Sequence, residues 1–456
     1  MKQSLTVSVL ALLVGISAAA AGGEAKSEVK NGLVAYAVRF EVPGQIYPMD
    51  ALCAKDLRRG ATWRLTGDPS HDDGSPAWSP DGQRLAFDRR DHRTLKSVIV
   101  VMDAAGKTRL VPGGQDSDWS PSWSHDGKRL VFLSRGGIFT MTVAGTERKR
   151  IVELGPQDID ASPRWSPDGS TISYDDGNPV AIFFVKPDGT GKTKFIDGGE
   201  LAWALDGNRA AYGTDLIDGD DAGQVHTISL DGSNPRRLTN YRAGAGSPAW
   251  SPDGRLIAFE RYNDDTDADA DVYLVNADGS RPRPLSNMRG GIVELAPAWQ
   301  ALPAEDSWHD LLKDRPACAL TGTSRSDRLR GTRRDDIAYT GKGRDLLRML
   351  GGADIAAGQG GADSVDGGAG ADRLGGGAGG DVLRGSGGRD ALFGGPGNDS
   401  LIGGQGSDVL VSGPGRDKVL AIDGVRDRIS CGSGRDRVEA DRVDRVARDC
   451  ERLRRR

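Results

Sequence analysis

The chain has 456 residues, of which 27% are charged, and its formal net charge is -5. A chain of this length exceeds what one hydrophobic core ordinarily organises, so we expect two or more domains. The arginines are dispersed among aspartates rather than clustered, which argues against a nucleic-acid partner, and the basic residues at 452–456 are interpreted as a solvated tail.

The N-terminus predicts a secretory signal peptide at residues 1–21. Lys2 supplies the positive start, residues 5–16 form a short apolar stretch, and residues 18–21 are small side chains suited to cleavage. A membrane anchor is the alternative interpretation, but the apolar run is shorter than the roughly 20 residues that a spanning helix needs. We therefore expect a secreted, extracellular protein with no integral membrane segment; a periplasmic or cell-surface location stays open.

Residues 30–300 contain a repeat with a period of roughly 40 to 50 residues. Its mark is Ser-Pro-Ala-Trp-Ser-Pro-Asp-Gly at 75–82, which recurs with small changes at 120–127 and 162–169 and intact at 247–254. Short apolar strands and a further Asp-Gly turn follow each mark. Four short strands per unit, joined by turns of this kind, are typical of a propeller blade.

One tryptophan recurs in each unit, and we expect it to pack between neighbouring blades. Six such positions predict six blades: Trp78, Trp123, Trp165, Trp203, Trp250 and Trp299. The first unit lacks its opening strand. We expect the strand around Trp299 to fill that place, which closes the ring and covers an exposed sheet edge.

These repeats resemble the WD40-like (PD40) repeats of the TolB propeller family. The resemblance covers residues 30–300 and implies a six-bladed β-propeller, but it says little about function. A nucleophile motif GxSxG is absent, and the five histidines have no ligand spacing.

An acidic loop in the last blade is a weak calcium candidate. Asp267, Asp269 and Asp271 alternate like the start of an EF-hand loop. The loop lacks the glycine and the closing glutamate of that motif, so a solvated loop is the favoured interpretation.

A linker is expected at 301–317, and a second repeat follows from residue 318 to 426. Eleven aspartates from Asp327 to Asp417 recur every nine residues, most of them after a glycine-rich turn and two residues before an aliphatic side chain. Six turn residues and three strand residues per unit place two units in one coil of a parallel β-roll. Turns on one edge are then 18 residues apart, so Asp372 should stack beside Asp390.

This unit resembles the hemolysin-type, or RTX, calcium-binding nonapeptide repeat. The resemblance implies several bound calcium ions, and the proposed ligands are Asp345, Asp354, Asp363, Asp372, Asp381, Asp390, Asp399, Asp408 and Asp417. A metal-free solenoid is the alternative, but the strict recurrence of aspartate favours calcium. Arg325 and Arg334 replace the inner glycine of the first two units, which we expect to cap the roll and to bind weakly or not at all.

The four cysteines of an exported chain favour disulfides. We expect Cys431 to pair with Cys450 and to staple a C-terminal cap at 427–456, since solenoid ends need caps. Cys53 and Cys318 are then left for each other by elimination. No CxxC motif indicates zinc.

The fold class is therefore predicted as all-β: an N-terminal six-bladed propeller followed by a parallel β-roll. The leading hypothesis is a secreted, non-enzymatic calcium-binding protein whose propeller is a platform for a protein or a cell-surface glycan. One alternative is a glycan lyase or hydrolase with its active site in the propeller channel, and another is a structural adhesin or spacer. Carboxylates with perturbed pKa values, or a histidine cluster, in the channel would favour the enzyme.

Overall fold

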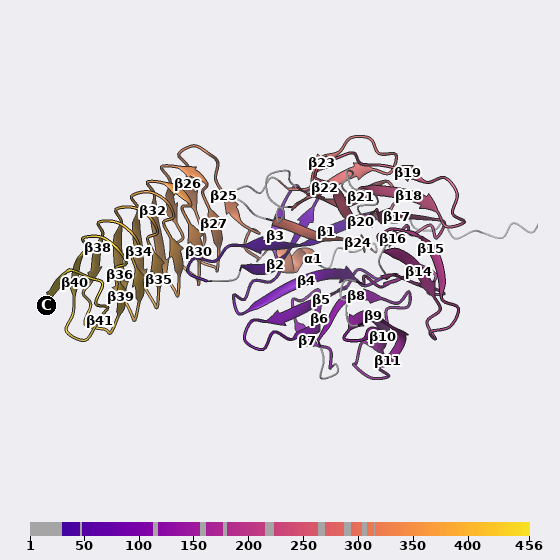
Figure 1. Ribbon diagram of the computed structural model, residues 1–456, viewed down its shortest axis with the longest axis horizontal. Coiled ribbons are helices and arrows are strands. Elements are labelled where there is room, and N and C mark those ends of the chain that lie inside the picture. The colour runs from indigo at the N-terminus through magenta and orange to yellow at the C-terminus, as the bar shows by residue number, and fades with distance from the viewer. Residues whose placement is uncertain are drawn as a thin grey trace, which may run out of the picture.

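The computed structural model describes residues 30–45, 48–112, 117–155, 161–176, 180–214, 223–262, 270–286, 293–302, 308–313 and 315–456. Two bodies lie end to end: a wheel of antiparallel sheets, and a narrow roll of parallel strands that extends from one side of the wheel (Figure 1). The segment 1–21 lies outside the described residues. No helix among the described residues is long and apolar enough to cross a membrane.

The wheel is a six-bladed propeller, and each blade is a four-stranded sheet. In strand order the blades are: β24 (Val293–Leu302), β1 (Lys30–Phe40), β2 (Met49–Asp56) and β3 (Thr62–Arg64); β4 (His71–Trp78), β5 (Arg84–Asp91), β6 (Ser97–Asp103) and β7 (Thr108–Leu110); β8 (Asp118–Trp123), β9 (Arg129–Ser134), β10 (Gly137–Thr142) and β11 (Lys149–Glu153); β12 (Arg164–Trp165), β13 (Ile172–Asp176), β14 (Ala181–Val185) and β15 (Thr193–Asp197); β16 (Gly199–Trp203), β17 (Arg209–Gly213), β18 (Val225–Ser229) and β19 (Arg236–Arg237); β20 (Ala245–Trp250), β21 (Leu256–Tyr262), β22 (Ala270–Asn276) and β23 (Arg283–Pro284). We number them blades 1 to 6.

The ring closes as the sequence predicted, because β24 from the end of the repeat pairs antiparallel with β1 from its beginning. Trp299 lies opposite Val34 in this register. The Trp299 indole N–H donates to the Ala249 carbonyl of blade 6 at 3.0 Å, and the Trp123 indole N–H donates to the Ala77 carbonyl of blade 2 at 2.9 Å. The tryptophans thus pack between neighbouring blades.

The repeated Ser-Pro-Asp-Gly segment builds the turn between the first two strands of a blade. The Gly82 N–H donates to the Ser79 carbonyl at 2.8 Å, and the Asp81 carboxylate accepts from the Gln83 N–H at 3.0 Å. Gly82 has φ +67°, and a Cβ there would lie 2.1 Å from the Ala301 carbonyl oxygen. Only glycine satisfies both the turn and the close approach of β24.

The roll consists of two eight-stranded parallel sheets, which face each other across a thin core. One contains β25 (Leu320–Thr321), β27 (Ile337–Tyr339), β30 (Ile355–Ala357), β33 (Arg373–Gly375), β35 (Ala391–Phe393), β37 (Val409–Val411), β39 (Arg428–Ser430) and β41 (Arg445–Val446). The other contains β26 (Arg328–Arg330), β29 (Leu346–Arg348), β32 (Ser364–Ala369), β34 (Val382–Gly387), β36 (Ser400–Gln405), β38 (Lys418–Ala421), β40 (Arg437–Ala440) and β42 (Arg452–Arg455). The short strands β28 (Lys342–Gly343) and β31 (Gly360–Gly361) pair within the turns.

Most strands of the roll contribute one or two buried aliphatic side chains to its core, whereas Leu453 of the edge strand β42 is exposed. Leu374 pairs with Leu392, and Leu392 with Leu410, so the register repeats every 18 residues as the nonapeptide spacing predicted. These side chains are fully buried. Each of the two sheets therefore contributes a single layer of side chains to the core.

The roll is fixed to blade 1. Cys53 of β2 is disulfide-bonded to Cys318, the pairing expected by elimination. The Phe40 and Tyr339 rings stack with centroids 6.2 Å apart, and the Arg373 guanidinium donates to the Pro43 carbonyl at 2.8 and 3.0 Å. The two bodies therefore share a covalent and a packed junction.

The short helix α1 (Trp308–Leu312) lies between the two bodies in the chain and contacts the propeller. Trp308 is fully buried, and its ring meets that of Trp78 edge-on with centroids 4.8 Å apart. Its indole N–H donates to the Gly82 carbonyl at 3.0 Å. This tryptophan extends the propeller core beyond the six blades.

Candidate functional site

The repeated aspartates of the roll stack in two columns, one along each edge. One carboxylate oxygen of each residue, Oδ1, accepts a hydrogen bond from the backbone N–H of the aspartate one coil earlier. The Asp363 N–H donates to Asp381 Oδ1 at 2.8 Å, and the Asp381 N–H donates to Asp399 Oδ1 at 2.8 Å. The sequence predicted this stacking, and the hydrogen bond explains why an acceptor recurs at this position in every coil.

The other carboxylate oxygen, Oδ2, is buried and has no hydrogen-bond partner among the described residues. This holds for eleven residues: Asp345, Asp354, Asp363, Asp372, Asp381, Asp390, Asp399, Asp408, Asp417, Asp427 and Asp436. A buried acceptor left unsatisfied costs about 1 to 3 kcal/mol, and more when it is charged. The chain therefore repeats an energetically costly arrangement from Asp345 to Asp436, which points to a partner that is not protein.

Burial and neighbouring carboxylates act together on these side chains. Burial, with the charges of Asp372, Asp336 and Asp335 adding to it, raises the pKa of Asp354 to about 8. The pKa of Asp390 rises to about 7 and that of Asp399 to about 6, again chiefly through burial. A bound cation would lower these pKa values again, because a nearby positive charge favours the ionised carboxylate.

The turn geometry fits a cation that prefers oxygen ligands. A Cβ on Gly376 would lie 2.4 Å from Asp381 Oδ2 and 2.7 Å from the Gly394 carbonyl oxygen. The glycine thus leaves space beside a carboxylate oxygen and a carbonyl oxygen from the next coil. No three His, Cys, Asp or Glu side chains converge anywhere in the described ranges, so carbonyl oxygens would complete the coordination. Calcium accepts such mixed oxygen sets in flexible geometry.

The first coil differs from the rest in a way that the sequence only partly revealed. Thr323 donates to Asp327 Oδ2 from its backbone N–H at 2.6 Å and from its hydroxyl at 2.9 Å. Thr332 makes the same pair of bonds to Asp336 Oδ2, at 2.5 and 2.9 Å. The orphaned oxygen therefore disappears in both units of this coil. Weak or absent metal binding there stays a prediction, but threonine four residues before the aspartate is its clearer signal.

Stacking also explains where arginine replaces the inner glycine. A Cβ on Gly379 would lie 1.4 Å from the Gly361 carbonyl oxygen of the preceding coil, and one on Gly397 would lie 1.4 Å from that of Gly379. Arg325 and Arg334 lie in the first coil, where no coil precedes them. The inner glycine is thus required by the neighbouring coil rather than by the turn alone.

The end of the roll continues the pattern beyond the predicted ligand set. Asp427 and Asp436 follow an extra residue in the repeat, yet each lies in the same column. The Asp408 N–H donates to Asp427 Oδ1 at 2.8 Å, across 19 residues. The sequence placed both residues in the predicted C-terminal cap, because the register slips by one residue after Asp417. The expected bond between Cys431 and Cys450 closes this end, with its Cα atoms 5.2 Å apart.

Of the three weak calcium candidates in blade 6, the structure describes only one. Asp267 and Asp269 lie outside the described residues. Asp271 lies in β22, half-buried and opposite Arg261 in the register of β21 and β22.

The propeller has a central cavity of about 680 Å³ with walls from all six blades. Its lining includes the six repeated tryptophans and residues of the segments that precede them. Most of the innermost strands are bulged before the tryptophan, with positive φ at Ser75, Ser120, Glu200, Ser247 and Ala296. The bulges turn backbone N–H groups towards neighbouring carboxylates.

Three of these carboxylates lie ten residues after the tryptophan in alternate blades: Asp88, Asp175 and Glu260. Asp88 accepts from the Ser120 N–H at 3.2 Å, Asp175 from the Ser162 N–H at 3.0 Å, and Glu260 from the Ala296 N–H at 2.6 Å. In the same blades the indole N–H groups of Trp78, Trp165 and Trp250 have no partner among the described residues. This set was not predicted, although the ten-residue spacing between tryptophan and acid is visible in the sequence.

The pKa values of these acids are shifted upwards. Burial raises the pKa of Glu260 to about 7, and the nearby charge of Glu200 adds to the effect. Burial likewise raises the pKa of Asp175 to about 6, and it raises that of Asp88 as well. Glu200 itself accepts from the Ser247 N–H at 2.6 Å and from its hydroxyl at 3.1 Å. The cavity therefore combines an aromatic wall with carboxylates that hold its backbone in place.

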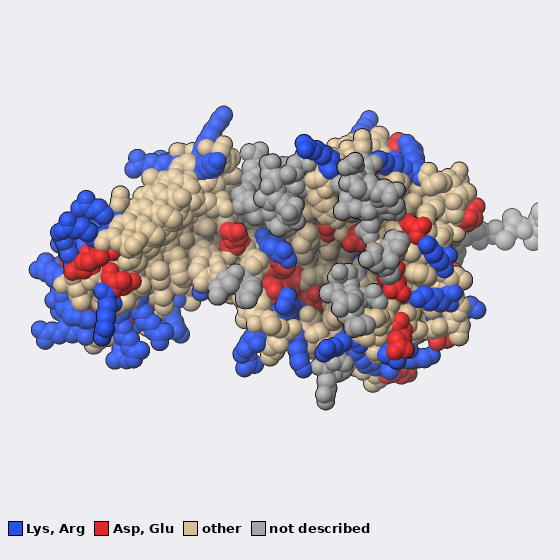
Figure 2. Space-filling model, in the orientation of Figure 1, with Lys and Arg blue, Asp and Glu red and all other residues tan. Residues whose placement is uncertain are grey.

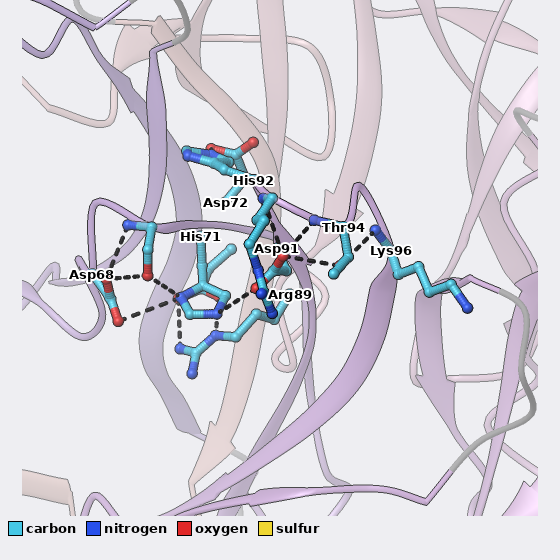
Figure 3. Close-up of polar contacts among 11 residues, drawn as sticks. Asp68, His71, Asp72, Arg89, Asp91, His92, Thr94 and Lys96 are labelled. Carbon is cyan, nitrogen blue, oxygen red and sulfur yellow. Dashed lines mark hydrogen bonds and ion pairs between the residues drawn. The ribbon is translucent and has the colours of Figure 1, made fainter.

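Two histidines that the sequence analysis treated as isolated lie together in blade 2 (Figure 3). His71 approaches Asp68 at 3.3 Å and Asp91 at 3.7 Å, and His92 Nε2 lies 2.8 Å from Asp72 Oδ1. The Asp72 carboxylate also accepts from the N–H of Asp50, which lines the central cavity. These contacts order the β4–β5 hairpin beside the cavity.

Both the propeller and the roll match known protein families. Residues 52–201 match the TolB beta propeller domain, and residues 321–348, 350–383 and 384–419 match the RTX calcium-binding nonapeptide repeat. The chain thus carries a TolB-like propeller and calcium-binding RTX repeats. No curated protein matches the chain.

Solved structures similar to the chain include two TolB proteins. TolB from Acinetobacter baumannii is 19% identical with a TM-score of 0.49, over 59% of this chain and 66% of its own. A putative TolB from Agrobacterium tumefaciens is 17% identical with a TM-score of 0.45, over 60% of this chain and 100% of its own.

Proposed function

We propose that this chain, a TolB-like propeller joined to RTX repeats, is a secreted protein that acts by binding rather than by catalysis. Its roll folds around several calcium ions, and its propeller binds a protein or a cell-surface glycan. The observation that carries the proposal is the unbroken series of orphaned Oδ2 atoms in the roll. The proposed calcium ligands are Asp345, Asp354, Asp363, Asp372, Asp381, Asp390, Asp399, Asp408 and Asp417, joined now by Asp427 and Asp436.

Secretion is supported by three features together. The first residues have the composition of a signal peptide, all four cysteines are disulfide-bonded, and RTX modules suit a compartment with free calcium. Extracellular calcium modules typically bind at about 10⁻⁴ to 10⁻³ M. The roll would then stay loose before export and fold where calcium is abundant, because metal binding supplies folding free energy.

A calcium titration of the full chain tests the proposal. All nine tryptophans precede residue 309, so their fluorescence reports the propeller, whereas circular dichroism reports both halves. We expect calcium to add strand signal saturably, EGTA to remove it, and magnesium to have little effect, while the tryptophan emission stays constant. A strand signal indifferent to calcium and EGTA would contradict the proposal.

An enzyme in the propeller cavity is the second candidate, and one observation favours it. Carboxylates whose pKa is raised towards neutrality, led by Glu260, could exchange a proton with a bound glycan as in a lyase or hydrolase. Against this, Glu260 and Glu200 already accept hydrogen bonds from bulge residues, as a supporting role requires. Release of reducing ends from acidic or neutral polysaccharides, abolished in Glu260→Gln, would establish the enzyme; no release by the intact chain would leave the binding function.

A further inference from the structure

At the free end of the roll the basic side chains are exposed, whereas most acidic side chains are buried or half-buried. Residues 416–456 contain thirteen lysines and arginines, every one of them exposed, and nine aspartates and glutamates, of which only Glu451 is exposed. In the sequence the two kinds alternate, as in Arg426-Asp427-Arg428. The fold turns the basic side chains outwards and places most of the aspartates in or near the stacked columns, so a segment of mixed charge forms a mainly basic surface. The exceptions are Glu451, which is exposed, and Glu439, which is ion-paired with Arg437 at 3.0 Å and with Arg456 at 2.9 Å.

Figure 2 shows this surface as a dense group of basic side chains at the end of the roll that carries the C-terminus. The basic residues stand in register on neighbouring strands. Lys418 lies beside Arg437 and Arg437 beside Arg452 on one sheet, and Arg428 lies beside Arg445 on the other. Neighbouring strands are about 4.8 Å apart, and like charges directly opposite each other destabilise a sheet.

A protective role for these arginines is the simplest alternative. Charged side chains on an edge strand prevent edge-to-edge aggregation, and β42 is such an edge. That role accounts for Arg452 and Arg454. It does not account for Lys418, Arg428 or Arg437, which lie on strands paired on both sides.

We propose that this end, here called the basic collar, binds a linear acidic polysaccharide. Twelve of its thirteen cations are arginines, whose planar guanidinium matches carboxylate and sulfate groups in two-point contacts. They cover both sheets and the turns between them, so a flexible chain can wrap the end, whereas a flat bilayer meets one side only. No aromatic side chain occurs in residues 416–456, so a platform for stacked bases is missing from this segment.

Bound calcium would increase the net positive charge of the collar. Three of the nine acids of this segment, Asp417, Asp427 and Asp436, are proposed calcium ligands, and bound cations would neutralise them without covering the arginines. The inference goes beyond the proposed propeller function, and it rests on the proposed calcium site only for this gain in positive charge.

The test is equilibrium binding of the calcium-loaded full chain to polygalacturonate and to dextran sulfate, with neutral dextran as the blank. The variant replaces Arg428, Arg437, Arg445 and Arg452 by glutamine. A matched control replaces four exposed propeller arginines by glutamine: Arg236, Arg242, Arg281 and Arg283. We expect both acidic polysaccharides to bind, the collar variant to lose about tenfold or more in affinity with a shallower salt dependence, and the control to keep its affinity.

Circular dichroism establishes that the collar variant is folded before its affinity is read. Equal affinity of collar variant and control would overturn the proposal. So would tighter binding of duplex DNA, or of phosphatidylglycerol vesicles, than of either polysaccharide. Binding that survives EGTA together with the strand signal would uphold the collar and contradict the calcium-dependent roll, which keeps the two proposals separable.

Discussion

The propeller and the roll bury opposite kinds of side chain. The propeller interior contains fully buried Tyr36, Phe87, Phe132 and Phe259, together with aliphatic clusters in each blade. The roll buries only one or two aliphatic residues in most of its strands and, beside them, one carboxylate in most of its turns. Apolar burial of about 25 cal/mol per Å² is enough to order the first kind of core. On the proposal above, the second kind of core needs a cation, so the propeller would fold without metal and the roll would fold only where calcium is present.

The largest expected effect comes from filling the space between coils. Gly379→Ala would place a methyl group 1.4 Å from the Gly361 carbonyl oxygen, and backbone cannot move aside as a side chain would. We expect a loss of roughly 3 kcal/mol or more in the roll, so that it fails to gain strand signal even at saturating calcium. Tryptophan emission should stay that of the folded propeller.

Gly424→Ala is the matched control, since Gly424 also has a positive φ, +84°, but no atom lies within 4 Å of its Cβ position. It should cost only about 1 kcal/mol from backbone strain. If both variants fold alike, contact between coils does not limit the roll.

A smaller effect should follow from removing charge while keeping shape. Asp381→Asn with Asp399→Asn retains the Oδ1 acceptor of the stacked hydrogen bonds but removes the anionic Oδ2. We expect the calcium midpoint to rise by about tenfold or more, because ligand charge sets affinity in such sites. Circular dichroism or calorimetric titration measures it.

The first coil offers the control for that pair. Asp327→Asn with Asp336→Asn changes two carboxylates whose Oδ2 atoms already accept from threonines. Its calcium midpoint should stay close to that of the parent chain. Equal shifts of the calcium midpoint in the two double variants would show that the Oδ2 atoms without a protein partner do not bind calcium in preference to the others.

The smallest effect is a pH dependence of the metal-free roll. Burial raises the pKa of Asp354 to about 8 and that of Asp390 to about 7, above the value near 4 of an unfolded chain. A raised pKa means that the folded roll favours the protonated carboxyl group. The contribution of that group to the free energy of unfolding is therefore present below pH 4 and is lost as the pH rises through 6 to 8.

Any strand signal that the calcium-free roll retains should therefore be larger at pH 5 than at pH 8. Calcium should reverse this order, because protons then compete with the metal. An equal strand signal at pH 5 and pH 8 without metal would contradict the account. The tryptophan emission of the propeller serves as the internal reference.

Local patterns predicted most of the architecture, since blades and coils are built from contacts that repeat along the chain. The Pro-Asp-Gly turns, the closing strand at Trp299 and the 18-residue stacking were all visible as spacing. What escaped prediction depends on contacts between distant repeats. The cavity acids accept hydrogen bonds mostly from the next blade, and the arginines of the collar separate from the aspartates only once the strand alternates its faces. Because arginine and aspartate alternate along the chain, the sequence alone indicated a dispersed charge rather than a basic surface.

The pairing of β24 with β1 also sets the order in which the protein can be completed. A polypeptide that emerges from its N-terminus exposes β1 long before β24 exists. Blade 1 stays an open edge until residue 302 has arrived, and only then does Cys53 meet a partner sixteen residues further on. Newly made chains will therefore depend on protection of that edge during the interval, and those cut short before β24 will associate through it.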